Sequence, residues 1–404
     1  MSTDKQPDEI AGYSAHQPSV ILLHGNDNLF SIIRSFRKRG IPVHLLNQPR
    51  AVARHCRGAT LIDLPKDVPL MEAAFQFLVG NESDYLKGSV LLAASDDALE
   101  CLATHRKALS AKYRLDACNP VAQFAMLDKL QTYRLATDAG VPTPQFWSVE
   151  KDTDLTALRD ELVYPLLVKP LLSHEFQKKF SRNVKFVTAN NFDETQDAVE
   201  LLHSLEIDVL LLEKIPGPDT QLCSYYTYMH EDGTSAFDFT KRIVRRYPKN
   251  MGLATCHVTD HVPDVKDLAL RLFNEAGLVG LANAEFKLDS RDDQLKLIEC
   301  NARFTAANGL VARAGIDLAS FVYNQQTGLP LPDTEHFEDD LTMWDPIRDF
   351  RAYRELRQAD EISFHAWMKS VCKRHTYPCF AWNDPFPAVV RLFQRVGKLR
   401  KIRG

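Results

Sequence analysis

The stretch that most constrains this chain runs from Leu281 to Phe304 and is expected to form two strands joined by a polar turn. In the first strand apolar and polar residues alternate, so Glu285 lies on the polar face. If the turn centres on Asp292, Glu285 lies opposite Glu299, because residues equidistant from a turn pair. Opposed carboxylates destabilise a sheet unless a cation or solvent separates them. Oxygen ligands of this kind suit Mg²⁺ held jointly with substrate phosphates.

Two further polar side chains follow on the second strand. Asn301, two residues past Glu299, returns to the same face with an amide oxygen, and Arg303 could bind a phosphate through its forked guanidinium. The pattern predicts a clamp for a metal ion and its phosphate ligand. An exposed hairpin with ordinary surface charge is the competing interpretation, and the hairpin alone does not separate the two.

Composition limits the classes of protein to consider. The 404 residues, 45% of them hydrophobic, can bury a large core in two to four domains, and the net charge of -4 gives no overall attraction to nucleic acid. The eight cysteines form no CxxC pair, which indicates reduced thiols. The polar first eighteen residues lack the apolar region of a signal peptide, and no segment has the length of a membrane span. We therefore expect a cytoplasmic protein.

The segment 19–118 repeats a unit of strand, polar loop and helix. Ser19 to Leu23 is a short apolar strand followed by the loop Gly25 to Asp27, and Ser89 to Ala94 leads in the same way into the loop Ser95 to Asp97. Such units build an open α/β sheet. Both loops should then lie at the carboxyl edge of the sheet, where α/β domains usually bind ligands.

Beyond a helix that ends at Gly140, polar positions interrupt apolar strands. Lys169 ends an apolar strand and requires an anionic partner, because burying its charge alone is costly. The basic segment 173–183 could close over a polyphosphate, although a charged loop is usually only solvated. The strand 208–213 ends in a Pro-Gly bend that exposes backbone groups able to bind an adenine edge, and Asp219 follows directly.

Several of these pieces, in order, resemble the ATP-grasp superfamily over residues 19–330. The resemblance is to its carbamoyl-phosphate-synthetase-like branch of carboxylate-amine ligases, which includes D-aspartate ligase. The matching segments are Asp128-Lys129 with Gly140-Val-Pro-Thr-Pro, Pro165-Leu-Leu-Val-Lys169-Pro, Leu212-Glu213-Lys214-Ile215, Glu285-Phe-Lys and Glu299-Cys-Asn301-Ala-Arg303. One departure is the phosphate-covering loop, which is usually rich in glycine and here has none.

The resemblance implies an α/β protein in four parts. It places a polar segment at 1–18, a Rossmann-like pre-ATP-grasp domain at 19–118, and a two-lobed α+β ATP-grasp domain at 119–330. A helical extension occupies 331–404, similar to the tails of predicted carboligases of this branch.

The resemblance also assigns residues to the site. Phosphates of ATP would be held by Lys129 and Lys169, with Lys185 assigned to the same nucleotide site. The adenine would be lined by Glu213, Lys214 and Ile215, and the ribose held by Asp219 in place of the more usual Glu. Mg²⁺ would be held by Glu285, Glu299 and Asn301, and the reacting acyl phosphate and acceptor by Arg303, Lys241 and Arg245.

The implied activity uses ATP and Mg²⁺ to activate a carboxylate as an acyl phosphate, which an amine then attacks. The substrates would be small molecules, such as an amino acid or a cell-envelope precursor. A nucleotide-binding regulatory or scaffold module without catalysis is the alternative function. Biotin-dependent carboxylation shares the nucleotide site, but the sequence shows no carrier lysine motif.

The last stretch, 387–404, predicts an amphipathic and strongly basic helix. Its apolar residues at helical spacing are Val389, Leu392, Phe393, Val396 and Leu399. Packing of this stripe on the core is one interpretation. Peripheral attachment to anionic lipid is the other, because each basic residue near such a surface adds about 1 kcal/mol.

Overall fold

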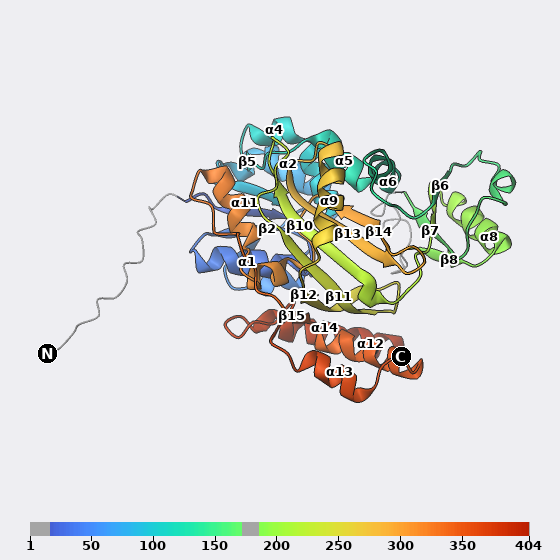
Figure 1. The fold of residues 1–404 in the computed structure, drawn as a ribbon. Coiled ribbons are helices and arrows are strands. Elements are labelled where there is room, and N and C mark those ends of the chain that lie inside the picture. Colours follow the sequence, from blue (N-terminus) through green and yellow to red (C-terminus); the bar gives the residue numbers. More distant parts are fainter. Residues whose placement is uncertain (1–16, 172–185, 404) are drawn as a thin grey trace.

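The computed structural model describes residues 17–171 and 186–403, which form three β-sheets with helices packed on them (Figure 1). The first sheet is parallel, in the order β3-β2-β1-β4-β5, as the βαβ repeats predict. Its strands are β1 (Val20–Leu23), β2 (Val43–Leu46), β3 (Ala59–Leu61), β4 (Val90–Ala93) and β5 (Arg114–Leu115). Its helices are α1 (Asn28–Lys38), α2 (Leu70–Val79), α3 (Asp96–Thr104) and α4 (Arg106–Ser110).

A small antiparallel lobe follows, with strand order β6-β9-β7-β8. Its strands are β6 (Phe146–Val149), β7 (Leu166–Pro170), β8 (Val187–Ala189) and β9 (Val209–Glu213). Helix α8 (Phe192–His203) packs on β7, β8 and β9 through a separate apolar cluster. Figure 1 shows this lobe projecting from the rest of the molecule.

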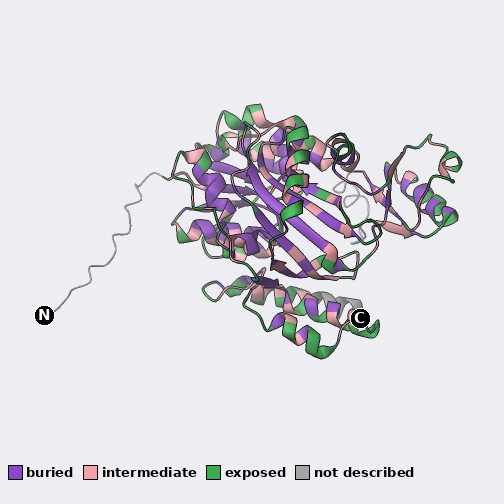
Figure 2. Cartoon of the chain, in the orientation of Figure 1, coloured by how far each residue is buried: buried purple, intermediate pink, exposed green. Residues whose placement is uncertain are grey.

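The third sheet has seven strands in the order β14-β13-β10-β11-β12-β15-β16, and all neighbouring pairs are antiparallel except the last, β15 with β16. Its long strands are β10 (Leu222–Met229), β11 (Phe239–Tyr247), β12 (Leu253–Thr259), β13 (Gly280–Asp289) and β14 (Gln294–Asn301), of which β14 lies at the edge. One face is covered by α5 (Pro120–Leu127), α6 (Lys129–Asp138) and α9 (Pro263–Glu275). Figure 2 shows the strands of this sheet largely buried.

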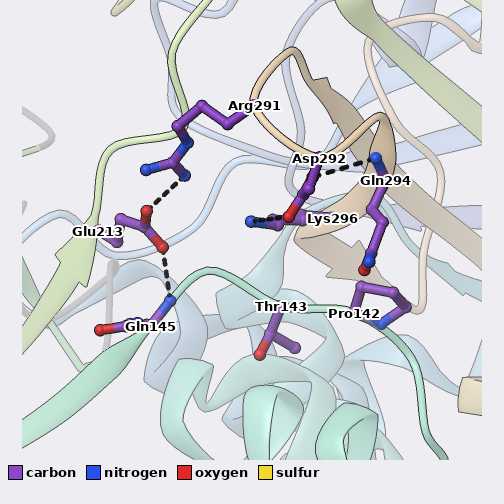
Figure 3. Close-up of a pocket in the computed structure, with 8 residues that line it drawn as sticks. All are labelled: Pro142, Thr143, Gln145, Glu213, Arg291, Asp292, Gln294 and Lys296. Atoms are coloured by element: carbon purple, nitrogen blue, oxygen red, sulfur yellow. Dashed lines mark hydrogen bonds and ion pairs between the residues drawn. The ribbon is translucent and has the colours of Figure 1, made fainter.

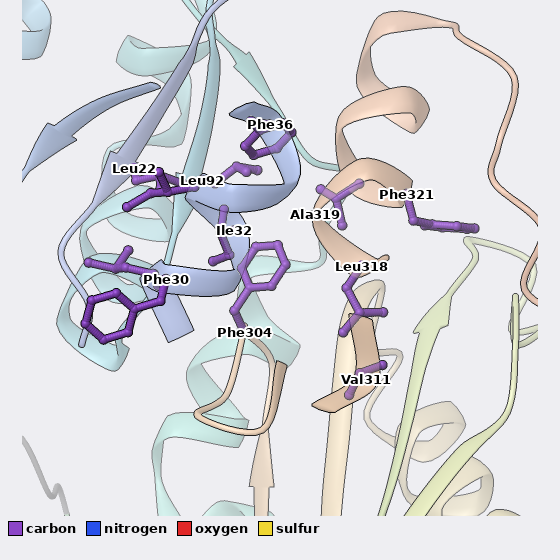
Figure 4. Close-up of a cluster of buried hydrophobic side chains, with 14 of the residues drawn as sticks. Leu22, Phe30, Ile32, Phe36, Leu92, Phe304, Val311, Leu318, Ala319 and Phe321 are labelled. Carbon is purple, nitrogen blue, oxygen red and sulfur yellow. The ribbon is translucent and has the colours of Figure 1, made fainter. Parts of the chain in front are cut away.

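One hydrophobic core crosses the predicted boundary at residue 118. Helices α10 (Asn308–Arg313) and α11 (Leu318–Thr327) pack on α1, far earlier in the chain. Phe304 and Phe321 join Leu22, Phe30 and Phe36 in this core (Figure 4). The end of the β13–β14 hairpin is therefore anchored to the parallel sheet, whose carboxyl-edge loops lie beside it.

The C-terminal segment is not purely helical, which corrects the expectation for 331–404. Two short strands, β15 (Thr342–Trp344) and β16 (His375–Thr376), extend the seven-stranded sheet. The helices are α12 (Pro346–Gln358), α13 (Phe364–Val371) and α14 (Phe386–Arg403). Within the described residues, no helix combines the length and the apolar character needed to cross a membrane.

Candidate active site

The β13–β14 hairpin carries the predicted metal residues. Glu285 lies opposite Glu299, which confirms the pairing expected from the sequence. Near the turn, however, Asp289 pairs with Gln294, one register away from the pairing that a turn centred on Asp292 would give. A bulge after Glu285 absorbs the difference and leaves Ile298 without a cross-strand partner. The bulge is thus what brings the two carboxylates face to face.

The same face continues across two more strands. Ser224 of β10 lies opposite Glu285, and Lys241 of β11 lies opposite Ser224. Lys241 is 1% exposed, and its ammonium donates to Ser224 Oγ at 2.9 Å. Burial lowers the pKa of Lys241, and the charge of Glu285 opposes that shift. We call this cross-strand set, Glu299, Glu285, Ser224 and Lys241, the active-site row.

Asn301 and Cys300 take opposite faces of β14. Asn301 lies opposite Asn283, and its amide nitrogen donates to Asn283 Oδ1 at 3.2 Å, which directs the Asn301 carbonyl oxygen elsewhere. Cys300 is buried in the cluster under α5, α6 and α9, as the alternation predicts, and burial raises the pKa of its thiol. All eight cysteines are free.

Arg303 is held by a loop of the parallel sheet. Its Nε and Nη2 both bind the carboxylate of Asp96, the Nη2 bond being 2.9 Å long, and Nη1 donates to the Phe304 carbonyl. Burial alone would lower the pKa of Arg303, but the charges of Asp96 and Glu299 raise it overall. Asp96 therefore fixes in place the guanidinium that was expected to bind a phosphate, close to Glu299.

Arg245 does not join the active-site row, contrary to the expectation of an acceptor-side role. Bulges in the β11–β12 pairing flank it. Its guanidinium makes bonds of 2.8 and 2.9 Å to Asp349 of α12 and donates to Ser370 Oγ at 2.8 Å. Arg245 and Asp349 are 3% and 0% exposed at their side chains. The pair fastens the C-terminal segment to the sheet.

Asp219 is also engaged within the protein. Its Oδ1 accepts bonds of 2.8 and 2.6 Å from Arg246, and Oδ2 accepts the Asn250 backbone N–H at 3.2 Å. The side chain is buried. These bonds hold the carboxylate beside the loop after β9 and leave acceptor capacity on Oδ2.

The predicted adenine segment lies where β9 ends. Lys287 of β13 donates to the carbonyls of Ile215 and Gly217 at 3.0 and 2.7 Å, which fixes the bend after β9. Burial and the charge of Arg246 lower the pKa of Lys287 to about 8. Lys214 is half-buried, and its backbone N–H donates to the Pro165 carbonyl at 3.0 Å.

The Glu213 side chain points into a separate polar cavity of about 510 Å³ (Figure 3). It accepts the Gln145 backbone N–H at 3.0 Å and an ion pair from Arg291 in the hairpin turn. Glu213 thus links the small lobe to the β13–β14 hairpin. The residues that line this cavity include no member of the active-site row.

The phosphate lysines come from two elements. Lys129 opens α6, and its ammonium donates to the Leu171 carbonyl at 3.2 Å. Lys169 lies near the end of β7, with its ammonium 5.6 Å from the centre of the Phe186 ring. Lys185 and the segment 173–183 lie outside the described residues.

The structure adds residues that the sequence reasoning missed. Ser224 joins the active-site row from β10, where an uninterrupted buried run hides the alternation. His24 sits beyond β1 with φ of 47°, and its Nδ1 lies 2.9 Å from Asp97 and 3.1 Å from Ser95. The loops expected at the carboxyl edge therefore meet there. The sequence indicated this meeting in one way, because both loops directly follow apolar strands.

No family model matches the chain. It is 22% identical to a D-aspartate ligase from Enterococcus faecium over 320 residues, 75% of each chain. The structure resembles an ADP complex of N5-carboxyaminoimidazole ribonucleotide synthetase, with TM-score 0.60 and 13% identity over 80% of each chain. An L-amino acid ligase from Bacillus licheniformis gives 0.57 and 17% identity over 78% of this chain and 76% of that one. In sequence the chain is thus similar to D-aspartate ligase, and its fold is that of ATP-grasp carboxylate-amine ligases.

Proposed function

We propose that the chain uses Mg²⁺ and ATP to phosphorylate a substrate carboxylate and then joins the acyl group to an amine. The active-site row carries this proposal, because it aligns two opposed carboxylates with a buried ammonium on one face of a single sheet. A sheet would gain nothing from opposing two carboxylates without a cation. The D-aspartate ligase relative makes acidic amino acids the first substrates to examine.

The residues present fit a magnesium ion that is shared with a nucleotide. Among the residues that the structure describes, no group of three or more His, Cys, Asp or Glu forms a metal cage. Glu285 and Glu299 with the Asn301 carbonyl would thus supply part of the coordination, and phosphate oxygens the rest, which is how Mg²⁺ is commonly held. When bound, Mg²⁺ and ATP supply the phosphoryl group and neutralise its charge.

The chain's own cations would then act around the transferred group. Arg303, fixed by Asp96, offers its guanidinium beside Glu299 for the acyl phosphate. Lys241, held by Ser224, would stabilise negative charge that develops on the substrate. Lys129 and Lys169 would contact the phosphates of ATP, and the backbone of 213–215 the adenine.

The proposal also covers the organisation of the chain. Residues 19–118 would act as the pre-ATP-grasp domain, 119–330 as the nucleotide-binding and catalytic domain, and 331–404 as an extension that joins the same sheet. The carboxylate and amine would be small molecules, and ATP use fits a cytoplasmic enzyme. Peripheral contact with a membrane through α14 is a separate proposal, tested below.

A substrate screen tests the function. ADP release should require Mg²⁺, one carboxylate and one amine together, and Glu299→Gln should lower it by about 100-fold or more, while Glu275→Gln, an exposed residue of α9, should not change it. The alternative, a non-catalytic nucleotide-binding module, predicts ATP binding without ADP release for every pair. Normal turnover in Glu299→Gln would show that the metal assignment is wrong.

A further inference from the structure

Two helices of the C-terminal segment reach the carboxyl-edge loops. Arg391 of α14 forms an ion pair with Asp27, in the loop after β1. Arg395, one turn further, lies 3.3 Å from Asp345, whose other oxygen accepts the Arg348 backbone N–H at 3.2 Å and so caps α12. Figure 1 shows these helices beside β12 and β15. The extension therefore contributes charge to the mouth of the proposed site.

Arg348 is the unusual member of this group. Its guanidinium is half-buried, and no described residue accepts a hydrogen bond from it. Burial lowers the pKa of Arg348, and Asp345 and Asp27 oppose that shift. The three arginines Arg348, Arg391 and Arg395 face two carboxylates, which leaves one positive charge unmatched. A half-buried cation without a hydrogen-bonded partner is costly, and an anion would satisfy it.

The unmatched charge adjoins the active-site row. His257 of β12 lies opposite Ile243, two residues along β11 from Lys241 and on the same face. Burial, Lys241 and Arg348 together hold the pKa of His257 well below its usual value, so the ring is neutral. Its Nδ1 is buried without a hydrogen-bond partner among the described residues. The positive end of the row thus extends through His257 to Arg348.

We propose that Arg348, supported by Arg391 and Arg395, binds a substrate carboxylate other than the one that becomes phosphorylated. The site would make the enzyme selective for acidic small molecules. A planar guanidinium pairs with a carboxylate through two parallel hydrogen bonds, which gives geometry as well as affinity. This inference rests on the proposed function, because it assigns the anion to a substrate of the ligase. The carboxylate could belong to the amine substrate or to a second acidic group of the acid substrate.

Calorimetry on the full chain tests the proposal directly. Aspartate and glutamate should bind more tightly than asparagine and glutamine, and Arg348→Gln should weaken the acidic ligands by about 10- to 150-fold while leaving the amides unchanged. Succinate and glutarate, which lack the amine, distinguish the two sources of the carboxylate. Arg354→Gln, an exposed residue of the same helix, is the matched control.

Arg348→Lys retains the positive charge but cannot form the two parallel hydrogen bonds of a guanidinium. Its affinity for the acidic ligands should therefore lie between those of the wild-type protein and Arg348→Gln. Urea unfolding of each variant shows whether the fold is intact. The proposal is wrong if wild-type protein does not prefer the acidic ligands, or if Arg348→Gln and Arg354→Gln behave alike. The proposed ligase function fails on a different result, the absence of ADP release with every substrate pair.

Discussion

Replacing Asp349 by Ala should destabilise the protein without touching the proposed chemistry. Asp349 is fully buried and accepts five hydrogen bonds. Two come from Arg245, and one each from Thr255 at 2.8 Å, Trp344 at 3.1 Å and Trp367 at 2.8 Å. Removing the carboxylate leaves a buried guanidinium whose remaining acceptor is Ser370 Oγ, and it leaves the indole N–H groups of Trp344 and Trp367 without the acceptor they share.

The expected loss follows from the buried ion pair. Breaking such a pair by removing one partner costs about 3–5 kcal/mol of the free energy of unfolding, mostly because the remaining charge stays buried. Replacing both partners by apolar residues, as in Arg245→Met with Asp349→Leu, should recover at least half of that loss. Urea unfolding followed by tryptophan fluorescence is a suitable assay, because Trp344 and Trp367 both contact Asp349.

One outcome would overturn this reasoning about Arg245. If Arg245→Met left the free energy of unfolding unchanged and lowered turnover, the guanidinium would act on a substrate, and the acceptor-side role inferred from the sequence would return. If instead both single variants lose stability and the double variant regains it, Arg245 fastens the C-terminal segment to β11.

Three further outcomes are expected. Lys169→Ala should weaken ATP binding by about tenfold in calorimetry, since its charge would lie against phosphates; unchanged affinity would make it a structural strand end. Lys287, with a pKa of about 8 when folded against 10.5 ordinarily, binds its proton less well in the folded state, so the free energy of unfolding should rise between these pH values and Lys287→Met should flatten the rise. If α14 attaches to lipid, the chain should pellet with anionic but not neutral vesicles at low salt, and replacing the exposed Leu392 and Phe393 by Ser should prevent it; no pelleting refutes attachment.

Local pattern was enough to predict the elements but not all of their neighbours. The parallel sheet and the pairing of Glu285 with Glu299 follow from apolar runs and strand alternation, which act over short distances. The bulge at Ile298 was not predicted, because an extra residue in one strand leaves no signal in composition. Two-residue and three-residue strands such as β15 and β16 are equally invisible, since alternation needs a longer run.

The partners that the sequence did not reveal are distant along the chain. Arg245 and its acceptor Asp349 are 104 residues apart, and Arg303 is 207 residues from Asp96. A local motif does not show whether a basic residue forms an ion pair with an acidic residue elsewhere in the chain.

For helix α14 the sequence predicted the helix but not the face that is buried. Its apolar residues Val389, Leu392 and Phe393 are 44%, 49% and 71% exposed, while Arg391 turns inward to Asp27. The expected packing of the apolar stripe on the core is therefore wrong for the described part of the helix. Periodicity identified an amphipathic helix, but the acidic loop opposite it decided which face is buried.

The separation of charge along the active-site row bears on substrate size. Carboxylates occupy β13 and β14, and the cations Lys241 and Arg348 lie on β11 and beside β12. Neighbouring strands are about 4.8 Å apart, so the backbones of Glu285 and Lys241, two strands apart, are separated by about 10 Å. The charged groups are closer, because the Lys241 ammonium reaches back to Ser224, which lies opposite Glu285. A metal-bound phosphate at Glu285 leaves room for only a few bonded atoms before the cationic end. If the carboxylate proposed to bind Arg348 belongs to the acid substrate, that acid should be compact, with its reactive carboxylate near Glu285 and its second carboxylate near Arg348.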